Sequence, residues 1–118
     1  MSAGWFLPRL VGLGTATDLM FTGRLVEADE ALEIGLVHRI APTEKFQDKV
    51  SALSLQLAAG PPIAHRWTKR AIHRSLGVDM NAEFEFEIFA QVQCIQSEDH
   101  REGVRAFKEK RVPVFKGR

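Results

Sequence analysis

Signals that end one helix and begin the next recur at short intervals along this chain, and they most constrain its fold. The sharpest is Gly60-Pro61-Pro62, because proline is tolerated in the first turn of a helix but not in its interior. Gly35 and Gly77 follow two further helical segments, and glycine suits the left-handed position after a helix end. The pattern predicts a mainly α fold of five to six helices, with at most one or two very short strands.

Side chains that can cap a helix mark where several of these helices begin. Thr15 with Asp18 has the spacing of a capping box, and so does Asp99 with Glu102. Asp79 suits the N-cap of a long helix. The expected helices cover residues 15–21, 28–34, 43–57, 62–76, 80–96 and 99–111.

Two segments are expected to be extended. Residues 36–40 read Leu-Val-His-Arg-Ile, and β-branched residues between turn signals predict one short strand or an extended piece. Pro113 begins an extended tail at the end of the last helix. No internal repeat and no linker long enough to divide domains is visible in the sequence.

Apolar residues at helical spacing indicate which helix faces are buried. The helix that follows Pro42 has one such row, which predicts a single buried face; its members are Phe46, Val50, Leu53 and Leu57. The helix over 80–96 has two rows, so we expect it to be buried over much of its circumference. These rows are Phe84, Ile88, Val92 and Ile95, and Phe86, Phe89 and Gln93.

The charge balance excludes some function classes. With 16 basic and 15 acidic residues the net charge is +1, which gives no support for binding nucleic acid. Residues 61–76 carry only basic charges and residues 79–87 only acidic ones, and we expect these adjacent blocks to pair on the folded surface. No apolar run approaches the roughly 18 residues of a membrane span, so no membrane association is expected.

The single cysteine and the first residues bear on the compartment. Cys94 alone excludes an internal disulfide and a cluster of cysteine metal ligands, so a reducing, cytoplasmic location is expected. The apolar start lacks a basic n-region and contains Pro8 and Arg9, which makes it a poor signal peptide. The 118 residues suit one domain.

No constellation of residues predicts a catalytic or metal site. The four histidines lack metal-ligand spacing, and Gly12-x-Gly14 lacks the third glycine of a dinucleotide fingerprint. Cys94 lies mid-helix among apolar neighbours and is interpreted as a structural thiol. The pairs Glu98-Asp99 and Glu83/Glu87 have simpler roles as a cap and an exposed stripe. From these patterns alone, the chain is a small helical domain of unspecified function.

Several short strings carry more information than their composition. They are Leu7-Pro-Arg-Leu-Val-Gly12, Phe21-Thr-Gly-Arg24, Ala28-Asp-Glu-Ala31, Gly35-Leu-Val-His38, Gly60-Pro-Pro-Ile-Ala64 with Lys69, Ser97-Glu-Asp-His-Arg-Glu-Gly103, Ala106-Phe-Lys-Glu-Lys-Arg111 and Phe115-Lys-Gly-Arg118. Their order and spacing resemble the crotonase family, the enoyl-CoA hydratases and isomerases. The resemblance covers essentially the whole chain but only the C-terminal part of the family's fold.

The resemblance implies a division of the chain and a limit on its chemistry. Residues 1–118 would form a single helical unit, with 1–42 ending the family's core spiral and 43–118 forming a helical oligomerisation region. In the family, the backbone amides of the oxyanion hole and the catalytic acids lie upstream of the residues matched here. The chain is therefore expected to be a C-terminal fragment or truncated member without catalytic residues, inactive alone. No cofactor is implied, since coenzyme A enters only as part of a thioester substrate.

The resemblance also implies ligand contacts and an assembly. Phe107 and Lys110 match a phenylalanine and a lysine near the nucleotide end of coenzyme A; a core phenylalanine and a solvated lysine are the alternatives. Trp5 and Phe6 fall near the acyl pocket, with core packing as the alternative. Family members usually form trimers, so we expect a homo-oligomer, self-association of the isolated chain and weak acyl-CoA binding.

A second reading belongs to another class of protein. The chain could be a non-catalytic helical interaction module, which binds a protein partner or supplies helices to another crotonase subunit. Both readings share the same helices and differ in what covers their apolar faces.

Overall fold

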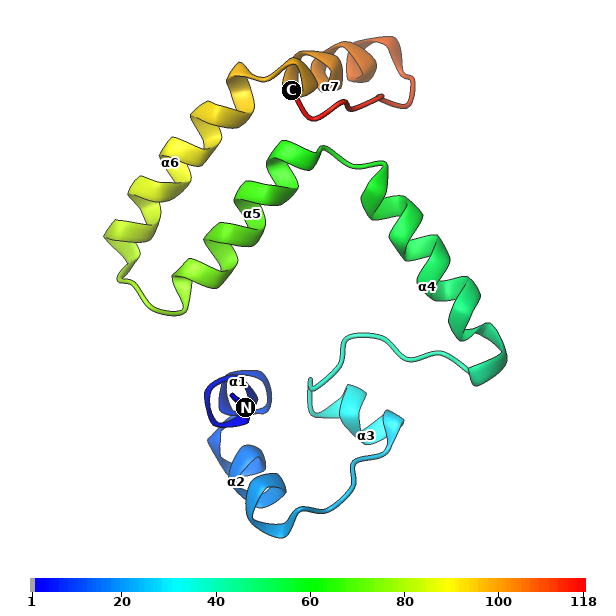
Figure 1. Ribbon diagram of the computed structural model, residues 1–118, viewed down its shortest axis with the longest axis vertical. Coiled ribbons are helices and arrows are strands. Elements are labelled where there is room, and N and C mark those ends of the chain that lie inside the picture. The colour runs from blue at the N-terminus through cyan, green and yellow to red at the C-terminus, as the bar shows by residue number, and fades with distance from the viewer. Residues whose placement is uncertain (1) are drawn as a thin grey trace. The chain divides into compact units, whose positions relative to one another are not determined.

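The computed structural model describes residues 2–118. Within this range it has seven helices and no strand (Figure 1), which confirms a mainly α fold with one helix more than expected. The helices are α1 (Ala3–Val11), α2 (Leu13–Thr22), α3 (Ala28–Glu33), α4 (Thr43–Ala58), α5 (Pro62–Ser75), α6 (Met80–Gln96) and α7 (Glu98–Glu109). Among these helices, none is long and apolar enough to cross a membrane.

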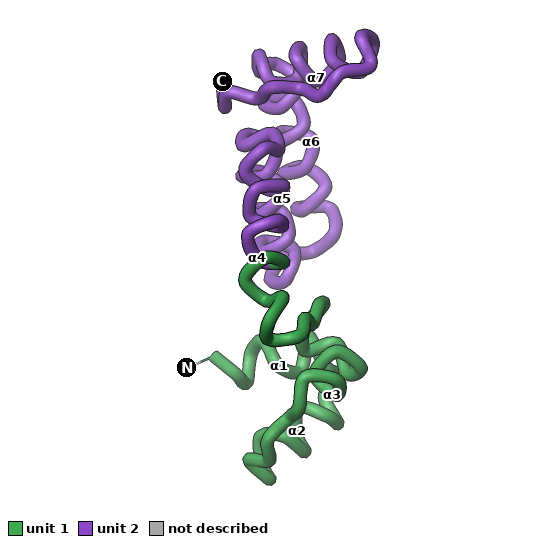
Figure 2. Tube along the Cα trace, turned by 90° about the vertical axis from the view of Figure 1, so that its right-hand side faces the viewer, with its two compact units in different colours: residues 1–49 green, residues 50–118 purple. Residues whose placement is uncertain are grey.

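The chain divides into two compact units, one ending at Lys49 and the other starting at Val50 (Figure 2). In the first unit, α1 packs against α2. In the second unit, α5 packs against α6, and α6 contacts α7. The predicted assignment of the two ends of the chain to a core spiral and an oligomerisation region stays a prediction.

The first helix is the element that the sequence did not predict. The backbone N–H groups of Trp5 and Phe6 donate to Ser2 O and start α1, and Gly12 with φ +80° ends it. Pro8 lies inside this helix, where it removes a backbone donor. That proline, in a stretch of only 9 residues, hides the helix from a sequence-based prediction.

The predicted start of the second helix was wrong and its end was right. α2 begins at Leu13, directly after the single linking residue Gly12, so Thr15 lies inside the first turn and caps nothing. Asp18 instead binds Arg24 through its carboxylate. The helix ends at Thr22, and Gly23 adopts the left-handed conformation with φ +63°, as its position after the helix predicts.

Of the two forms predicted for residues 36–40, a short strand or an extended piece, the strand does not form. Gly35 has φ +74° and follows α3 as expected, but the N–H of Val37 then donates back to Ala31 O at 3.1 Å. This bond closes the end of α3 and turns the chain away from an extended path. The remaining residues of the segment are irregular, because a β-branched run forms a strand only beside another strand.

The helices α5 and α6 begin at the residues that the sequence predicted. Pro62 is the first residue of α5, and Asp79 caps α6 by accepting hydrogen bonds from the N–H groups of Asn81 and Ala82 at 2.9 and 3.0 Å. The expected pairing of charge blocks is confirmed at one point, where Arg74 Nε lies 3.4 Å from Glu83 Oε2.

The predicted cap of the last helix was wrong. Ser97, not Asp99, caps α7 by accepting from the N–H of His100 at 3.0 Å. Asp99 lies one residue inside the helix and is buried, with Glu102 a turn further on. Both carboxylates bind the C-terminal tail instead of the helix's own first turn. The tail from Pro113 is irregular, as predicted.

The buried core of the described residues is small. Its apolar members are Ala16, Ala31, Ala90 and Ala106, and no large side chain is fully buried. The rows predicted to be buried are mostly open, with Phe84 64% and Phe46 56% exposed. The prediction of buried faces was therefore wrong for most of these residues, although α5 partly covers Phe86 and Phe89 of the second row on α6.

Candidate functional site

An aromatic cluster joins α5 to α6 in the second unit. The Trp67 ring makes edge-on contacts with Phe86 and Phe89, at centroid distances of 5.9 and 5.5 Å. The Arg70 guanidinium lies 4.7 Å from the Trp67 ring centroid. Edge-to-face rings and a cation over an indole are both attractive geometries, so this cluster holds the two helices side by side (Figure 1).

A largely apolar groove of about 470 Å³ lies where α5, α6, α7 and the tail meet. Its lining residues are Pro61, Ile63, Ala64, Cys94, Ser97, Asp99, His100, Gly103, Val104, Phe107, Lys108 and Phe115. Apolar walls with a few polar groups are typical of a site for an organic ligand. We call this feature the α7 groove.

The structure brings one of the two predicted coenzyme A contacts into the α7 groove. Phe107 lines it and is 85% exposed. Among the described residues, Phe107 therefore does not pack in a core, which was the alternative to a ligand contact. Lys110 follows the end of α7 in the left-handed conformation, with φ 54°, and is not among the lining residues. The lysine that lines the groove is Lys108, which the sequence comparison with the family pattern did not single out.

Cys94 also lines the α7 groove and is half-buried. The sequence placed it mid-helix, and it does lie in α6. Since Cys94 is only partly shielded from solvent, the prediction of a buried structural thiol holds in part. Within residues 2–118, no group of histidine, cysteine or carboxylate side chains is arranged to hold a metal ion.

The other two predicted ligand contacts lie in the first unit, on α1. Trp5 and Phe6 are 47% and 44% exposed. The Arg9 guanidinium lies 3.5 Å from the Trp5 ring centroid and donates to Trp5 O at 2.8 Å. The Trp5 ring is thus partly covered by its own helix, and a role in an acyl pocket stays a prediction.

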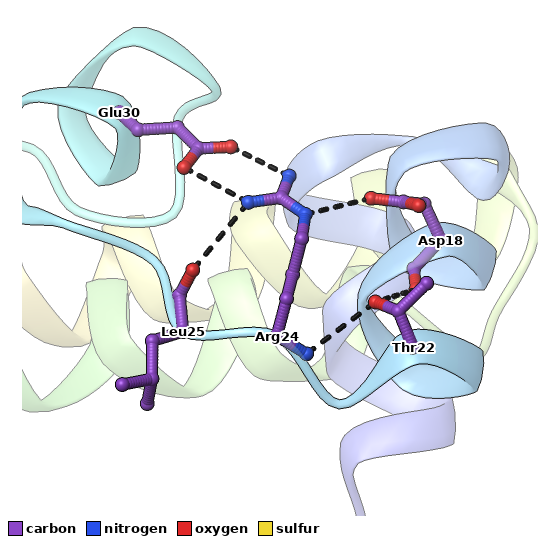
Figure 3. Close-up of polar contacts among 5 residues, drawn as sticks. All are labelled: Asp18, Thr22, Arg24, Leu25 and Glu30. Atoms are coloured by element: carbon purple, nitrogen blue, oxygen red, sulfur yellow. Dashed lines mark hydrogen bonds and ion pairs between the residues drawn. The ribbon is translucent and has the colours of Figure 1, made fainter.

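Arg24 is the centre of a polar network in the first unit (Figure 3). Its guanidinium donates to Asp18 at 2.9 Å and to both oxygens of Glu30 at 3.0 and 2.6 Å. These hydrogen bonds hold the pKa of Glu30 below its ordinary value and raise that of Arg24. Because one guanidinium holds both carboxylates, the network links α2 to α3.

A second guanidinium–carboxylate pair lies beside the α7 groove. Glu102 accepts two hydrogen bonds from Arg111, at 2.5 and 3.0 Å, and one from the N–H of Val114 at 3.0 Å. The hydrogen bonds from Arg111, followed by that from Val114, lower the pKa of Glu102 to about 2. The sequence predicted Glu102 as part of a cap; the signal for its true partner is the arginine nine residues later.

The helical arrangement matches solved enzymes over almost the whole chain. An enoyl-CoA hydratase from Bacillus anthracis matches with a TM-score of 0.95 and 38% identity, over 99% of this chain and 45% of that one. The short-chain-enoyl-CoA hydratase of Clostridium acetobutylicum is 35% identical over 113 residues, 95% of this chain and 43% of that protein. A mouse mitochondrial protein, enoyl-CoA hydratase domain-containing protein 2, is 38% identical over 95% of this chain and 39% of its own length.

The chain thus spans less than half the length of these relatives. The family model for enoyl-CoA hydratase/isomerase matches residues 1–118. Sequence strings, helix order and the match to solved structures agree, and the chain therefore belongs to the enoyl-CoA hydratase/isomerase family.

Proposed function

We propose that this chain forms the C-terminal helical part of an enzyme that acts on acyl-CoA thioesters, and that its own share is to bind coenzyme A, not to carry out the chemistry. Membership of the family supports the substrate class. The chain's share of its relatives' length, 43% for the Clostridium hydratase, supports the restriction to one part of an enzyme.

The α7 groove is the observation that carries the proposal. The flat adenine ring can lie against the exposed Phe107 ring, since every nucleotide base has a π-face that stacks on aromatic side chains. The ammonium groups of Lys108, in the groove, and Lys110, just past the helix end, are suited to the phosphates. We assign the nucleotide end of coenzyme A to this groove, with Phe107 and Lys110 as the contacts implied by the family pattern.

Chemistry by the isolated chain is not expected. A thioester enolate needs fixed N–H donors aimed at its oxyanion, and loss of one such donor typically costs about 10²–10³ in rate. The family places these donors and its acids upstream of the residues matched here. We therefore propose that the chain alone has no turnover, that it self-associates through its exposed apolar faces, and that it acts in the cytoplasm.

The binding part of the proposal is tested with adenosine 3′,5′-bisphosphate, which carries the nucleotide end of coenzyme A without the thioester. We expect weak binding in an NMR titration, with the largest shifts around Phe107. Phe107→Ala and Lys110→Ala should each weaken it several-fold, while Lys45→Ala, on α4, should not. Shifts elsewhere, or binding unchanged in Lys110→Ala, would contradict the assignment of these contacts.

The enzymatic part of the proposal is tested with a chimera. This chain replaces the matched 113-residue segment of the Clostridium acetobutylicum hydratase, and hydration of a short-chain enoyl-CoA is measured. We expect turnover by the chimera and none by the isolated chain. A chimera that folds and assembles but has no turnover argues for the alternative, a helical module without a part in the reaction.

A further inference from the structure

The C-terminal tail, residues 112–118, runs back beside α7 (Figure 1). It forms neither helix nor strand, so its backbone N–H groups need other acceptors. Glu102 accepts from Val114 at 3.0 Å, and Asp99 accepts from the two residues near the end of the tail. The tail is therefore held by side chains of α7.

Asp99 is the more buried of the two carboxylates that hold the tail, with only 4% of the residue exposed. One of its oxygens accepts from the N–H of Lys116 at 2.6 Å, and the other from the N–H of Gly117 at 2.8 Å. Its own N–H donates to Arg118 O at 3.1 Å. Hydrogen bonds to an ionised acceptor are stronger than neutral ones, so the burial of this carboxylate is compensated by the tail alone.

The hydrogen bonds from Lys116 and Gly117 to Asp99 fix the position of the preceding residue, Phe115. Phe115 is half-buried, and its ring lies over Gly103 of α7, where a Cβ would come within 3.7 Å of the ring. Gly117, whose N–H is one of the two bonded to Asp99, has φ +76°, and a Cβ there would come within 3.2 Å of Pro62. The tail thus lies between α7 and the start of α5, with little freedom to shift.

The fixed ring of Phe115 is one wall of the α7 groove, to which Phe107 also belongs. Without the bonds to Asp99, the polar contacts left between the tail and α7 would be those at Glu102 and at the exposed pair of Arg118 with Glu98. The position of the Phe115 ring, and with it the width of the groove, would then no longer be set.

We propose that Asp99 is a positioning residue for the α7 groove: by binding the amides of Lys116 and Gly117 it holds the Phe115 ring in place as an aromatic wall for the bound nucleotide. The ligand in this statement rests on the proposed function, whereas the anchoring of the tail does not. Asp99 also lines the α7 groove, but both of its carboxylate oxygens accept from tail amides, so in this scheme it acts through the tail.

The test compares Asp99→Asn, Phe115→Ala and the double variant with the unchanged chain. Asn has one acceptor oxygen in place of two, so amide exchange at Lys116 or Gly117 should become about tenfold faster, the order expected for loss of one hydrogen bond to a charged group. Adenosine 3′,5′-bisphosphate should bind about fivefold more weakly to Asp99→Asn and to Phe115→Ala, since each removes an ordered stacking surface. Asp48→Asn, which makes the same substitution at an exposed aspartate of α4, is the matched control and should change neither measurement.

The double variant decides whether Asp99 acts through Phe115. If it does, Asp99→Asn should weaken binding no further once Phe115 is alanine. Equal weakening in both backgrounds, or unchanged exchange at Lys116 and Gly117, would overturn the proposal. Phe115→Ala leaves every bond of Asp99 intact, so it keeps the test decisive if Asp99→Asn folds poorly. If the unchanged chain binds no nucleotide, the proposed function fails, and the exchange rates together with the Phe115 ring shifts still judge the anchor.

Discussion

Lys110 adopts a backbone conformation that its side chain disfavours. It is the only described residue after Ser2 that has a positive φ without being glycine, with φ 54°. Its N–H closes the end of α7 on Ala106 O and Phe107 O. Glycine is the usual residue at such a helix end because it lacks the Cβ that clashes there.

Lys110→Gly should therefore stabilise the chain by about 1 kcal/mol, since it removes the left-handed strain. Lys110→Ala keeps the Cβ and should leave stability nearly unchanged. Thermal unfolding measures the difference. Both variants remove the ammonium, so both should lose nucleotide binding if it contacts the ligand. Only Lys110→Gly also removes the Cβ, so only that variant should gain stability. A Lys110→Gly chain no more stable than Lys110→Ala would contradict this account of the turn.

Glu102 should make stability depend on pH in the acidic range. Its pKa is about 2 in the folded chain, against an ordinary value of 4.5. The stabilisation by Arg111 and Val114 is thus fully present above pH 4.5 and is lost as the pH falls through about 2. In urea unfolding, Glu102→Gln should be less stable than the unchanged chain at neutral pH, and the difference should vanish towards pH 2.

The control for this prediction is Glu85→Gln, on α6, because the structure shows no ion pair for Glu85 among the described residues. Its difference from the unchanged chain should stay flat over the same pH range. A Glu102→Gln difference that does not depend on pH would show that the carboxylate's charge is not what holds Arg111.

At the scale of elements, α3 depends on a single arginine. The helix has 6 residues, too few to be stable alone. Arg24 holds Glu30 in its first turn and Asp18 of α2 at the same time (Figure 3). A planar guanidinium can serve both carboxylates, whereas an ammonium cannot match the two oxygens of Glu30 in the same way.

Arg24→Lys should thus loosen α3 without changing the charge of the chain. Hydrogen exchange at the amides of Ala31 and Ile34, which close its turns, should become faster by several-fold. Arg39→Lys is the matched control in the same unit, since no described ion pair involves Arg39. Unchanged protection in Arg24→Lys would mean that packing, not the network, holds the helix.

Elements also differ in how well the sequence predicted them. α6 was predicted with both of its ends, because its N-cap Asp79 bonds to residues only two and three positions away. α1 was missed, because Pro8 breaks the local rule for a helix interior. The sequence left open whether residues 36–40 form a strand, and none forms, since a strand depends on a partner that lies elsewhere in the chain.

At the scale of the whole molecule, large apolar side chains remain uncovered. On α6 alone, Phe84, Ile88 and Ile95 are 64%, 55% and 47% exposed. Soluble monomers rarely leave contiguous apolar surface of this kind in water. The isolated chain should therefore self-associate, and light scattering should give a molar mass above 13.2 kDa that rises with concentration.

Ile88→Glu should lower that mass, because it places a charge in the middle of the exposed row. Gln96→Glu adds the same charge at the end of α6 and should have little effect. A monomer at all concentrations, with little binding of a hydrophobic dye, would contradict self-association through these faces.

The sequence by itself determined most of the helices and the family. Helix caps, breakers and apolar spacing act within one or two turns, so α5 and α6 could be predicted from neighbouring residues. The short strings that resemble the crotonase family lie along the chain in a fixed order, and the comparisons confirm that membership. Those strings also single out Phe107, which lines the α7 groove.

Only the tertiary structure decided which residues meet. The bonds of Asp99 reach 17 and 18 residues along the chain, and they made an expected cap into an anchor for the tail. Lys108 lines the α7 groove, whereas Lys110 lies in the left-handed turn that follows α7 and is not among the lining residues. Local signals carry no information on such contacts, since their free energy comes from packing between elements that are distant in sequence.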